Sequence, residues 1–312
     1  KLKGLSKLST NVGFSPLIVI LLMVSGCTTV EVGELQTESH FVELENADSV
    51  DIELDMSSGE MNIAGGADKL LDAEFRYNVA AWKPEIKYNV IGDKGKLIVR
   101  QPRLEGIVGP NARNEWDLAI NEDIPMDLSI DLSSGNCDFN MGSSLLKTLK
   151  IDSSSGNVDS ILIGNQSLLK EVNLDMSSGA ASLDLSGDYP SLSKLVIKSS
   201  SGNVDADLNG NYGSLSNVEI DLSSGNAFVD LSGNWESDAQ VELAASSGQI
   251  TLRLPQDVGV YVDAQTSSGN IKANGFRLDG DNYINDAYSE SNVTIHIKAT
   301  VSSGNIELLL VD

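Results

Sequence analysis

A Ser-Ser-Gly triplet recurs along this chain at a near-constant interval and limits the folds that it can adopt. Residues 218–231 show the full pattern and read Val-Glu-Ile-Asp-Leu-Ser-Ser-Gly-Asn-Ala-Phe-Val-Asp-Leu. The glycines of the triplets are Gly59, Gly135, Gly156, Gly179, Gly202, Gly225, Gly248, Gly269 and Gly304, and neighbours in the central run from Gly156 to Gly248 are 23 residues apart. A fixed period of this length predicts a repeat protein, in which one supersecondary unit stacks on the next.

Apolar residues alternate with polar residues on both sides of each triplet. Before Gly225, the apolar positions extend from Val218 to Leu222; after it, they extend from Ala227 to Leu231. A period of two indicates a half-buried strand on each side. Leu222 and Ala227 are an odd number of residues apart, so one continuous strand could not keep both on the same face. Ser-Ser-Gly-Asn is therefore predicted to be a corner, with Gly or Asn at positive φ.

Two short strands and a corner cannot bury their apolar face alone, whereas stacked coils can, at a spacing of about 4.8 Å. We therefore predict an all-β fold, a β-solenoid built as a single-stranded β-helix with about 23 residues per coil. An antiparallel sandwich whose strands look alike by chance is the alternative.

Two longer intervals predict additions to the coils. Between Gly59 and Gly135, strand-like segments at residues 71–79, 85–91, 96–100 and 114–120 indicate an inserted strand and hairpin region near the N-terminus. A sheet that bears its aromatic residues would close one end or one side of the solenoid. The interval before Gly304 ends in a segment that we expect to form the last coil, with Leu309 and Val311 pointing outward.

The N-terminal residues carry the pattern of an export signal. Three lysines precede the apolar run of residues 16–24, which is short for a membrane span. The sequence Val-Ser-Gly-Cys at residues 24–27 resembles a bacterial lipobox, which implies cleavage before Cys27 and its lipidation; several acyl chains on one residue suffice for stable anchoring. An ordinary signal peptide followed by a coincidental Cys is the alternative.

The chain is therefore divided into four parts. Residues 1–26 are predicted to be a lipoprotein signal peptide, residues 27–47 an acidic tether, residues 48–128 an N-terminal β region, and residues 129–312 the solenoid repeats.

Segments outside the central array are similar to a known family. Residues 63–71, 82–85, 114–118, 124–128, 251–260, 275–276 and 283–288 resemble the bacterial toast-rack family, which is similar to the C-terminal domain of cell-wall-active-antibiotic response proteins. The 23-residue coils resemble an adhesin-like β-helix family. The resemblance covers about residues 50–312, but this chain has Ser-Ser-Gly where Gly-Ala-Gly is expected at several corners. It implies a β-solenoid in the cell envelope and brings no catalytic residues.

The net charge limits the classes of ligand that the chain can bind, and the cysteine content limits its disulfides. The formal charge is −24, and removal of residues 1–26, which hold three lysines and no acids, would make it −27. Such a chain is not expected to bind nucleic acid or anionic lipid. With Cys27 lipidated, only Cys137 would remain, so no intrachain disulfide could form. Cys137 occupies an inward position and is expected to be a buried core residue rather than a reactive thiol.

Two columns of aspartates are the only pattern with possible metal chemistry. Stacking in register would align Asp131, Asp152 and Asp175 in one column, interrupted by Lys198, and Asp184, Asp207 and Asp230 in another, ended by Arg253. Neighbouring carboxylates would repel one another, and Ca²⁺ would relieve the repulsion. Weak Ca²⁺ binding and a solvated acidic face are the two interpretations, and no other cofactor is predicted.

These observations favour a non-enzymatic envelope lipoprotein, adhesin-like or a scaffold. Its expected partners are the membrane, through Cys27, and an envelope or extracellular surface protein. The outer membrane or cell surface is favoured over the inner membrane because Thr28, not Asp, follows the anchor Cys. An accessory module in envelope-stress sensing and a carbohydrate-binding or carbohydrate-active β-helix protein are the alternatives.

Overall fold

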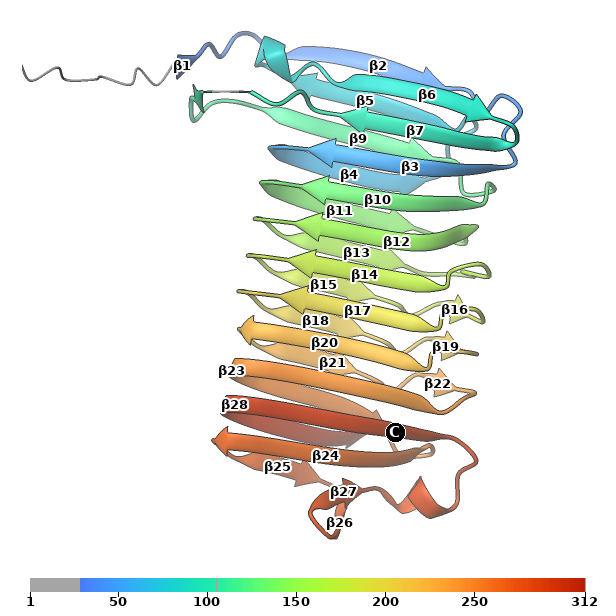
Figure 1. Cartoon of the computed structure of the whole chain (residues 1–312), viewed down its shortest axis with the longest axis vertical. Helices are drawn as coiled ribbons and strands as arrows, with labels where there is room; N and C mark the ends of the chain where they lie inside the picture. Colours follow the sequence, from blue (N-terminus) through green and yellow to red (C-terminus); the bar gives the residue numbers. More distant parts are fainter. Residues whose placement is uncertain (1–28, 105, 312) are drawn as a thin grey trace, which may run out of the picture.

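The rungs of a parallel β-solenoid form the body of the molecule (Figure 1). The computed structural model describes residues 29–104 and 106–311. Each rung from the one that contains residues 49–65 onward has two strands joined by a Ser-Ser-Gly corner, and neighbouring rungs pair in parallel through both strands. The predicted all-β solenoid is therefore confirmed, and the sandwich alternative is wrong.

The strands fall into two columns, one on each side of the corner. In spatial order the first column is β7 (Lys94–Arg100), β3 (Ser49–Met56), β10 (Met126–Leu132), β12 (Leu146–Ser153), β14 (Glu171–Met176), β17 (Lys194–Ser199), β20 (Asn217–Ser224), the first halves of β23 (Ala239–Pro255) and β28 (Thr294–Val311), and β24 (Gly259–Ser268). The second column is β9 (Asn114–Ile120), β4 (Gly59–Gly65), β11 (Gly135–Met141), β13 (Val158–Leu162), β15 (Ala181–Asp184), β18 (Val204–Asp207), β21 (Ala227–Asp230), the second halves of β23 and β28, and β25 (Ile271–Asn274).

The corner glycines stack directly on one another. Each has a positive φ, between 106° at Gly179 and 155° at Gly269. A Cβ built on Gly202 would lie 1.7 Å from the carbonyl oxygen of Gly179, and one on Gly225 would lie 1.7 Å from that of Gly202. The backbone ladder passes through the corner, since the Gly202 N–H donates to the Ser224 carbonyl at 3.1 Å. Glycine is required here for the close approach of the rungs as well as for its φ.

The asparagine after the glycine links neighbouring rungs. The Oδ1 atom of Asn203 accepts the N–H of Asn226 at 3.1 Å, and Asn226 does the same for Gln249 at 3.0 Å. These bonds satisfy backbone donors that the turn leaves without a strand partner.

An aromatic stack on a third side of the solenoid was not predicted. The short strands β16 (Asp188–Tyr189), β19 (Asn211–Tyr212) and β22 (Asn234–Trp235) form a separate parallel sheet. Tyr189 and Tyr212 stack with ring centroids 5.3 Å apart, and Trp235 follows at 5.0 Å. The signal in the sequence was the 23-residue recurrence of Gly-Asp-Tyr, Gly-Asn-Tyr and Gly-Asn-Trp, because identical positions of successive rungs must stack.

The inserted region closes the N-terminal end, as predicted. Strand β5 (Leu71–Tyr77) pairs antiparallel with β9, and β6 (Glu85–Ile91) pairs antiparallel with β7 in the predicted hairpin. Phe75 packs edge-on against the fully buried Trp116, at 5.3 Å. The short helix η1 (Ala80–Trp82) buries Trp82, and β1 (Thr29–Val30) pairs with β8 (Ile107–Val108) beside it.

Residues 36–42 differ from the prediction, which placed them in the tether. They form β2 (Gln36–Val42), which pairs antiparallel with β5 along its whole length. The cap has an open edge there, and pairing satisfies the backbone groups of β5 on that side. The predicted boundary between residues 128 and 129 lies inside β10, so the repeats begin earlier than expected.

The C-terminal strand is not the outermost coil, contrary to the expectation. Strand β28 lies between β23 and the β24–β25 rung, and Leu309 is opposite Arg253 on one side and Asn274 on the other. The chain leaves a gap of one rung and fills it at its end. The outermost rung carries β26 (Arg277–Asp279), β27 (Asn282–Ile284) and η2 (Asp286–Ser289), which lie at the lower end in Figure 1.

Substitution of a corner glycine tests the stacking constraint. We expect Gly202→Ala to destabilise the fold by several kcal/mol, because about 1–3 kcal/mol of backbone strain adds to the cost of moving two rungs apart. Gly66→Ala is the matched control: Gly66 has a φ of 95° but nothing within 4 Å of a built Cβ. Denaturant unfolding of both variants checks this, and equal losses would contradict the stacking argument.

Two buried serines with opposite hydrogen-bonding states give a second prediction. Ser153 points into the core and its Oγ has no partner among the described residues, whereas the Oγ of Ser144 donates to Gln166 Oε1 at 2.6 Å. Ser153→Ala should raise the free energy of unfolding by about 1 kcal/mol, and Ser144→Ala should lower it by about as much. Thermal unfolding measures both, and a loss for Ser153→Ala would show that its hydroxyl is satisfied in solution.

Candidate functional site

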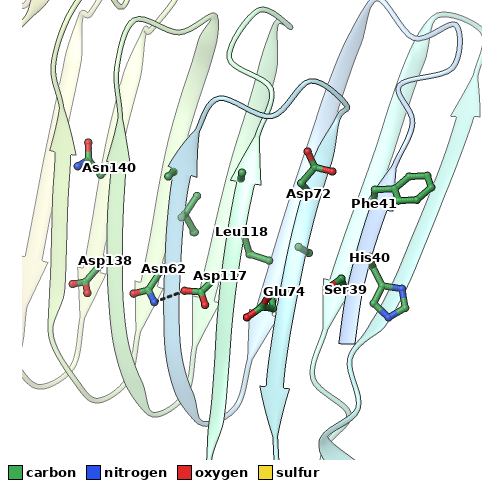
Figure 2. A pocket seen from close by; sticks show the side chains of 14 residues that line it. Ser39, His40, Phe41, Asn62, Asp72, Glu74, Asp117, Leu118, Asp138 and Asn140 are labelled. Atoms are coloured by element: carbon green, nitrogen blue, oxygen red, sulfur yellow. Dashed lines mark hydrogen bonds between the residues drawn. The ribbon is translucent and has the colours of Figure 1, made fainter. Parts of the chain in front are cut away.

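A depression lies on the outer face of the capped end of the solenoid. It has a volume of about 790 Å³ and lies across β11, β4, β9, β5 and β2 (Figure 2). Because these strands are paired in register, their outward side chains form two rows across the sheet. We call this surface the N-terminal depression.

One row is mostly acidic, and the other row forms the floor of the N-terminal depression. Side by side across the strands, the acidic row holds Asp138, Asn62, Asp117, Glu74 and Ser39. The floor row holds Asn140, Ala64, Ala119, Asp72 and Phe41. Two adjacent alanines create the hollow, since their neighbours in both rows are larger.

The acidic row is partly fixed by hydrogen bonds. Asn62 Nδ2 donates to Asp117 Oδ1 at 2.7 Å, and the Arg76 guanidinium bonds to the other Asp117 oxygen. Arg76 also lies 3.2 Å from Glu115. The Asn62 amide and Asp117 are thus oriented in advance, which lowers the entropic cost of binding a ligand.

Strand β2 is held against the cap by a second network. Lys83, Tyr77 and His40 all hydrogen-bond the carboxylate of Glu38, at 2.8, 2.6 and 3.1 Å. The Lys83 ammonium, followed by the other two donors, lowers the pKa of Glu38 to about 2. Burial, followed by the nearby carboxylate, raises the pKa of Tyr77 to about 12. Phe41, on the other face of β2, remains 62% exposed, with Lys69 Nζ 3.1 Å from its ring centroid.

The predicted aspartate columns form in register. Asp131 lies between Asp55 and Asp152, and Asp175 is followed by Lys198, as predicted. Asp55 was not included in the prediction, although it stands four residues before Gly59, as Asp131 does before Gly135, and this shared offset was the signal for it. Burial and then the charges of Asp55 and Asp152 raise the pKa of Asp131.

The second column has a structural task. The Oδ1 atoms of Asp184, Asp207 and Asp230 each accept the backbone N–H two residues ahead, at 2.9, 3.1 and 3.0 Å. Such bonds fix a turn at the end of the strand. Arg253 ends the column with a 2.6 Å contact to Asp230, which is 3% exposed.

The two columns lie on different strands of the rung and do not converge. Among the residues outside the masked positions, no three His, Cys, Asp or Glu side chains are grouped so that they could hold a metal ion. Ca²⁺ binding by these six aspartates therefore stays a prediction that would depend on neighbouring carboxylates within one column.

The two cysteines have different outcomes. Cys137 is fully buried, as predicted, and burial raises the pKa of its thiol to about 12, so the thiolate is disfavoured. Cys27 lies outside the described residues. Within the described part of the chain, no helix has the length and apolar character needed to cross a membrane.

Comparison with known proteins gives a family and several similar folds. A family model described as the N-terminal domain of toast_rack, DUF2154, matches residues 31–186, half of the chain. No curated protein matches the chain.

Three solved structures are similar over most of the chain. A candidate cell adhesion protein from Clostridium sporogenes ATCC 15579 is 24% identical, with 89% of this chain and 100% of that chain covered and a TM-score of 0.35. A candidate adhesin from Bacteroides fragilis NCTC 9343 is 14% identical, with 90% and 100% covered and a TM-score of 0.47. A candidate adhesin from Parabacteroides distasonis ATCC 8503 is 12% identical, with 90% and 100% covered and a TM-score of 0.26.

Replacing Asp207 by a neutral residue tests whether neighbouring carboxylates of the second aspartate column repel one another. Burial, followed by the charge of Asp230, raises the pKa of Asp207, so the folded state binds a proton more readily than the unfolded state. The ionised Asp207 carboxylate therefore lowers the stability of the fold at neutral pH. This loss of stability disappears as the pH falls toward 3.8, the ordinary pKa of an aspartate. Asp207→Asn keeps the turn-fixing Oδ1 and should stabilise the fold at pH 7 by less than about 1 kcal/mol.

The measurement is thermal unfolding between pH 7 and pH 4, where the gain should shrink. Asp279→Asn, at an exposed position on β26 outside both columns, removes the same charge elsewhere, so it is the control and should change stability little. A gain that is independent of pH would contradict the electrostatic explanation.

Proposed function

Because the chain belongs to the toast-rack family, whose N-terminal domain model matches residues 31–186, we propose that it is a non-enzymatic interaction module of the cell envelope. In this proposal Cys27 carries the lipid anchor, and the solenoid presents its outward columns to an envelope or extracellular partner at the outer membrane or cell surface.

The observation that carries the proposal is the continuity of the solenoid. One hydrogen-bonded ladder and one apolar core run from the β2–β5 cap to the β24–β25 rung (Figure 1). A body of this kind holds surface groups at fixed spacings over a long distance, which suits display and recognition better than a reaction cycle that needs moving parts.

The position of the cap supports the same proposal. Strand β1 begins at Thr29, and it pairs with β8 beside the cap. An anchor on Cys27 would thus place the capped end, with the N-terminal depression, nearest to the membrane and the β24–β25 rung farthest from it. The acidic surface favours cationic or neutral partners over nucleic acid.

Lipid attachment is tested by replacing each cysteine in turn. Expressed in a bacterial host and labelled with an alkyne analogue of palmitate, the full chain should incorporate label, and Cys27→Ser should lose it. Cys137→Ala, a small substitution in the buried column, is the control and should keep the label. Label that persists in Cys27→Ser would overturn the anchor.

Exposure at the surface is tested separately. Protease added to intact cells should remove the solenoid, detected by an antibody to it, while a periplasmic marker stays intact. Protection of the solenoid until the envelope is broken would contradict a surface location and place the module inside the envelope.

A further inference from the structure

The N-terminal depression combines an apolar floor with a surplus of hydrogen-bond acceptors. Asp72, Glu74, Asp117 and Asp138 line it, and an ionised carboxylate only accepts hydrogen bonds. Neither Asp72 nor Asp138 makes a side-chain hydrogen bond or an ion pair with another described residue. A ligand that fits must therefore present hydrogen-bond donors to these carboxylates.

Several ligand classes fail this requirement. Nucleic acids and anionic glycans would be repelled by the carboxylates. A peptide backbone carries as many acceptors as donors, and its carbonyls would face side chains that mostly accept. A hydroxyl can rotate to donate to a carboxylate and an ammonium group only donates, so a sugar that bears free amines provides both kinds of donor.

The geometry of the floor also suits a sugar ring. Ala64 and Ala119 lie opposite each other on neighbouring strands, and the acidic row runs alongside them. Neighbouring strands are about 4.8 Å apart, which is comparable with the length of one pyranose unit. A saccharide chain that lies across the strands would bring successive rings to successive polar side chains. Phe41 stands at the end of the floor row, where its exposed ring can contact the apolar face of a sugar (Figure 2).

We propose that the N-terminal depression binds an oligosaccharide that carries free amino groups, with one ring on the floor formed by Ala64 and Ala119. Asp72 and Asp138 receive its ammonium and hydroxyl donors from the two ends of the depression, while the oriented Asn62 and Asp117 bind hydroxyls between them. This inference rests on the proposed function, since it names the ligand class of the interaction module.

The test is calorimetric titration of the full chain, purified in detergent, with a β-1,4-linked glucosamine tetramer. We expect binding of the tetramer, and binding at least about tenfold weaker for its fully N-acetylated counterpart, because acetylation removes the charge-assisted hydrogen bonds. Tetralysine blocked by N-terminal acetylation and C-terminal amidation, with the same number of free amines and no sugar rings, should also bind at least about tenfold more weakly. Equal affinity for tetralysine would overturn the proposal in favour of nonspecific attraction to an acidic surface.

Matched variants locate the site. Ala119→Leu fills the floor and should abolish binding, whereas Ser182→Leu, at an exposed position on β15, should not change it. Asp72→Asn and Asp138→Asn should each weaken binding about tenfold. Asp205→Asn, on β18, should leave it unchanged. Thermal unfolding of each variant shows whether it is folded. If Ala119→Leu does not fold, the effect of Asp72→Asn on binding still tests the location of the site.

Failure of this proposal is distinguishable from failure of the proposed function. No binding of the tetramer, or equal binding by the wild type and Ala119→Leu, would overturn the ligand class and leave the lipid labelling and protease results in force. Binding that depends on Ala119 and Asp72, together with label that persists in Cys27→Ser, would support the ligand class and overturn only the anchor.

Discussion

At one corner of the solenoid the glycine backbones of successive rungs approach one another closely, and the register of the strands on both sides of the corner follows from this contact. From Gly59 to Gly269 in space, each corner glycine lies against the carbonyl of the one before it, so a side chain at any of them would push two rungs apart. The strands on both sides can pair in register only if the corner stays this narrow. The asparagine bonds, the inward apolar columns and the aspartate columns all depend on that register.

The two ends of the solenoid solve the same problem in related ways. A terminal rung exposes strand edges and core side chains, which invites aggregation. At the N-terminal end the chain places the β3–β4 rung first, builds the cap beyond it and returns to add β10 on the other side. At the C-terminal end it builds the β24–β25 rung first and inserts β28 beneath it. At each end, the rung next to the terminal rung therefore pairs with a strand that is not its immediate neighbour in the sequence.

The N-terminal depression is a consequence of this insertion. In the regular rungs the outward positions follow the repeat, whereas the cap brings together strands that are not subject to it. Outward alanines on β4 and β9 become neighbours there, and the edge strand β2 contributes Phe41. A concave surface with its own donor and acceptor pattern forms where the cap interrupts the repeat. The surface that we propose to bind a ligand thus forms where the strands of the cap depart from the repeat.

The sequence by itself determined the solenoid, its corners and the register of its columns. A 23-residue period forces equal positions to stack, so Asp152 beside Asp175, Lys198 beside Asp175 and buried Cys137 could all be predicted. The same logic would have found the Tyr189–Tyr212–Trp235 stack. Only the tertiary structure decided the spatial order of the end rungs, the role of β2 and the depression. Ala64 and Ala119 share no period with one another, and their contact depends on which rung the chain leaves open and later fills, which local patterns do not encode.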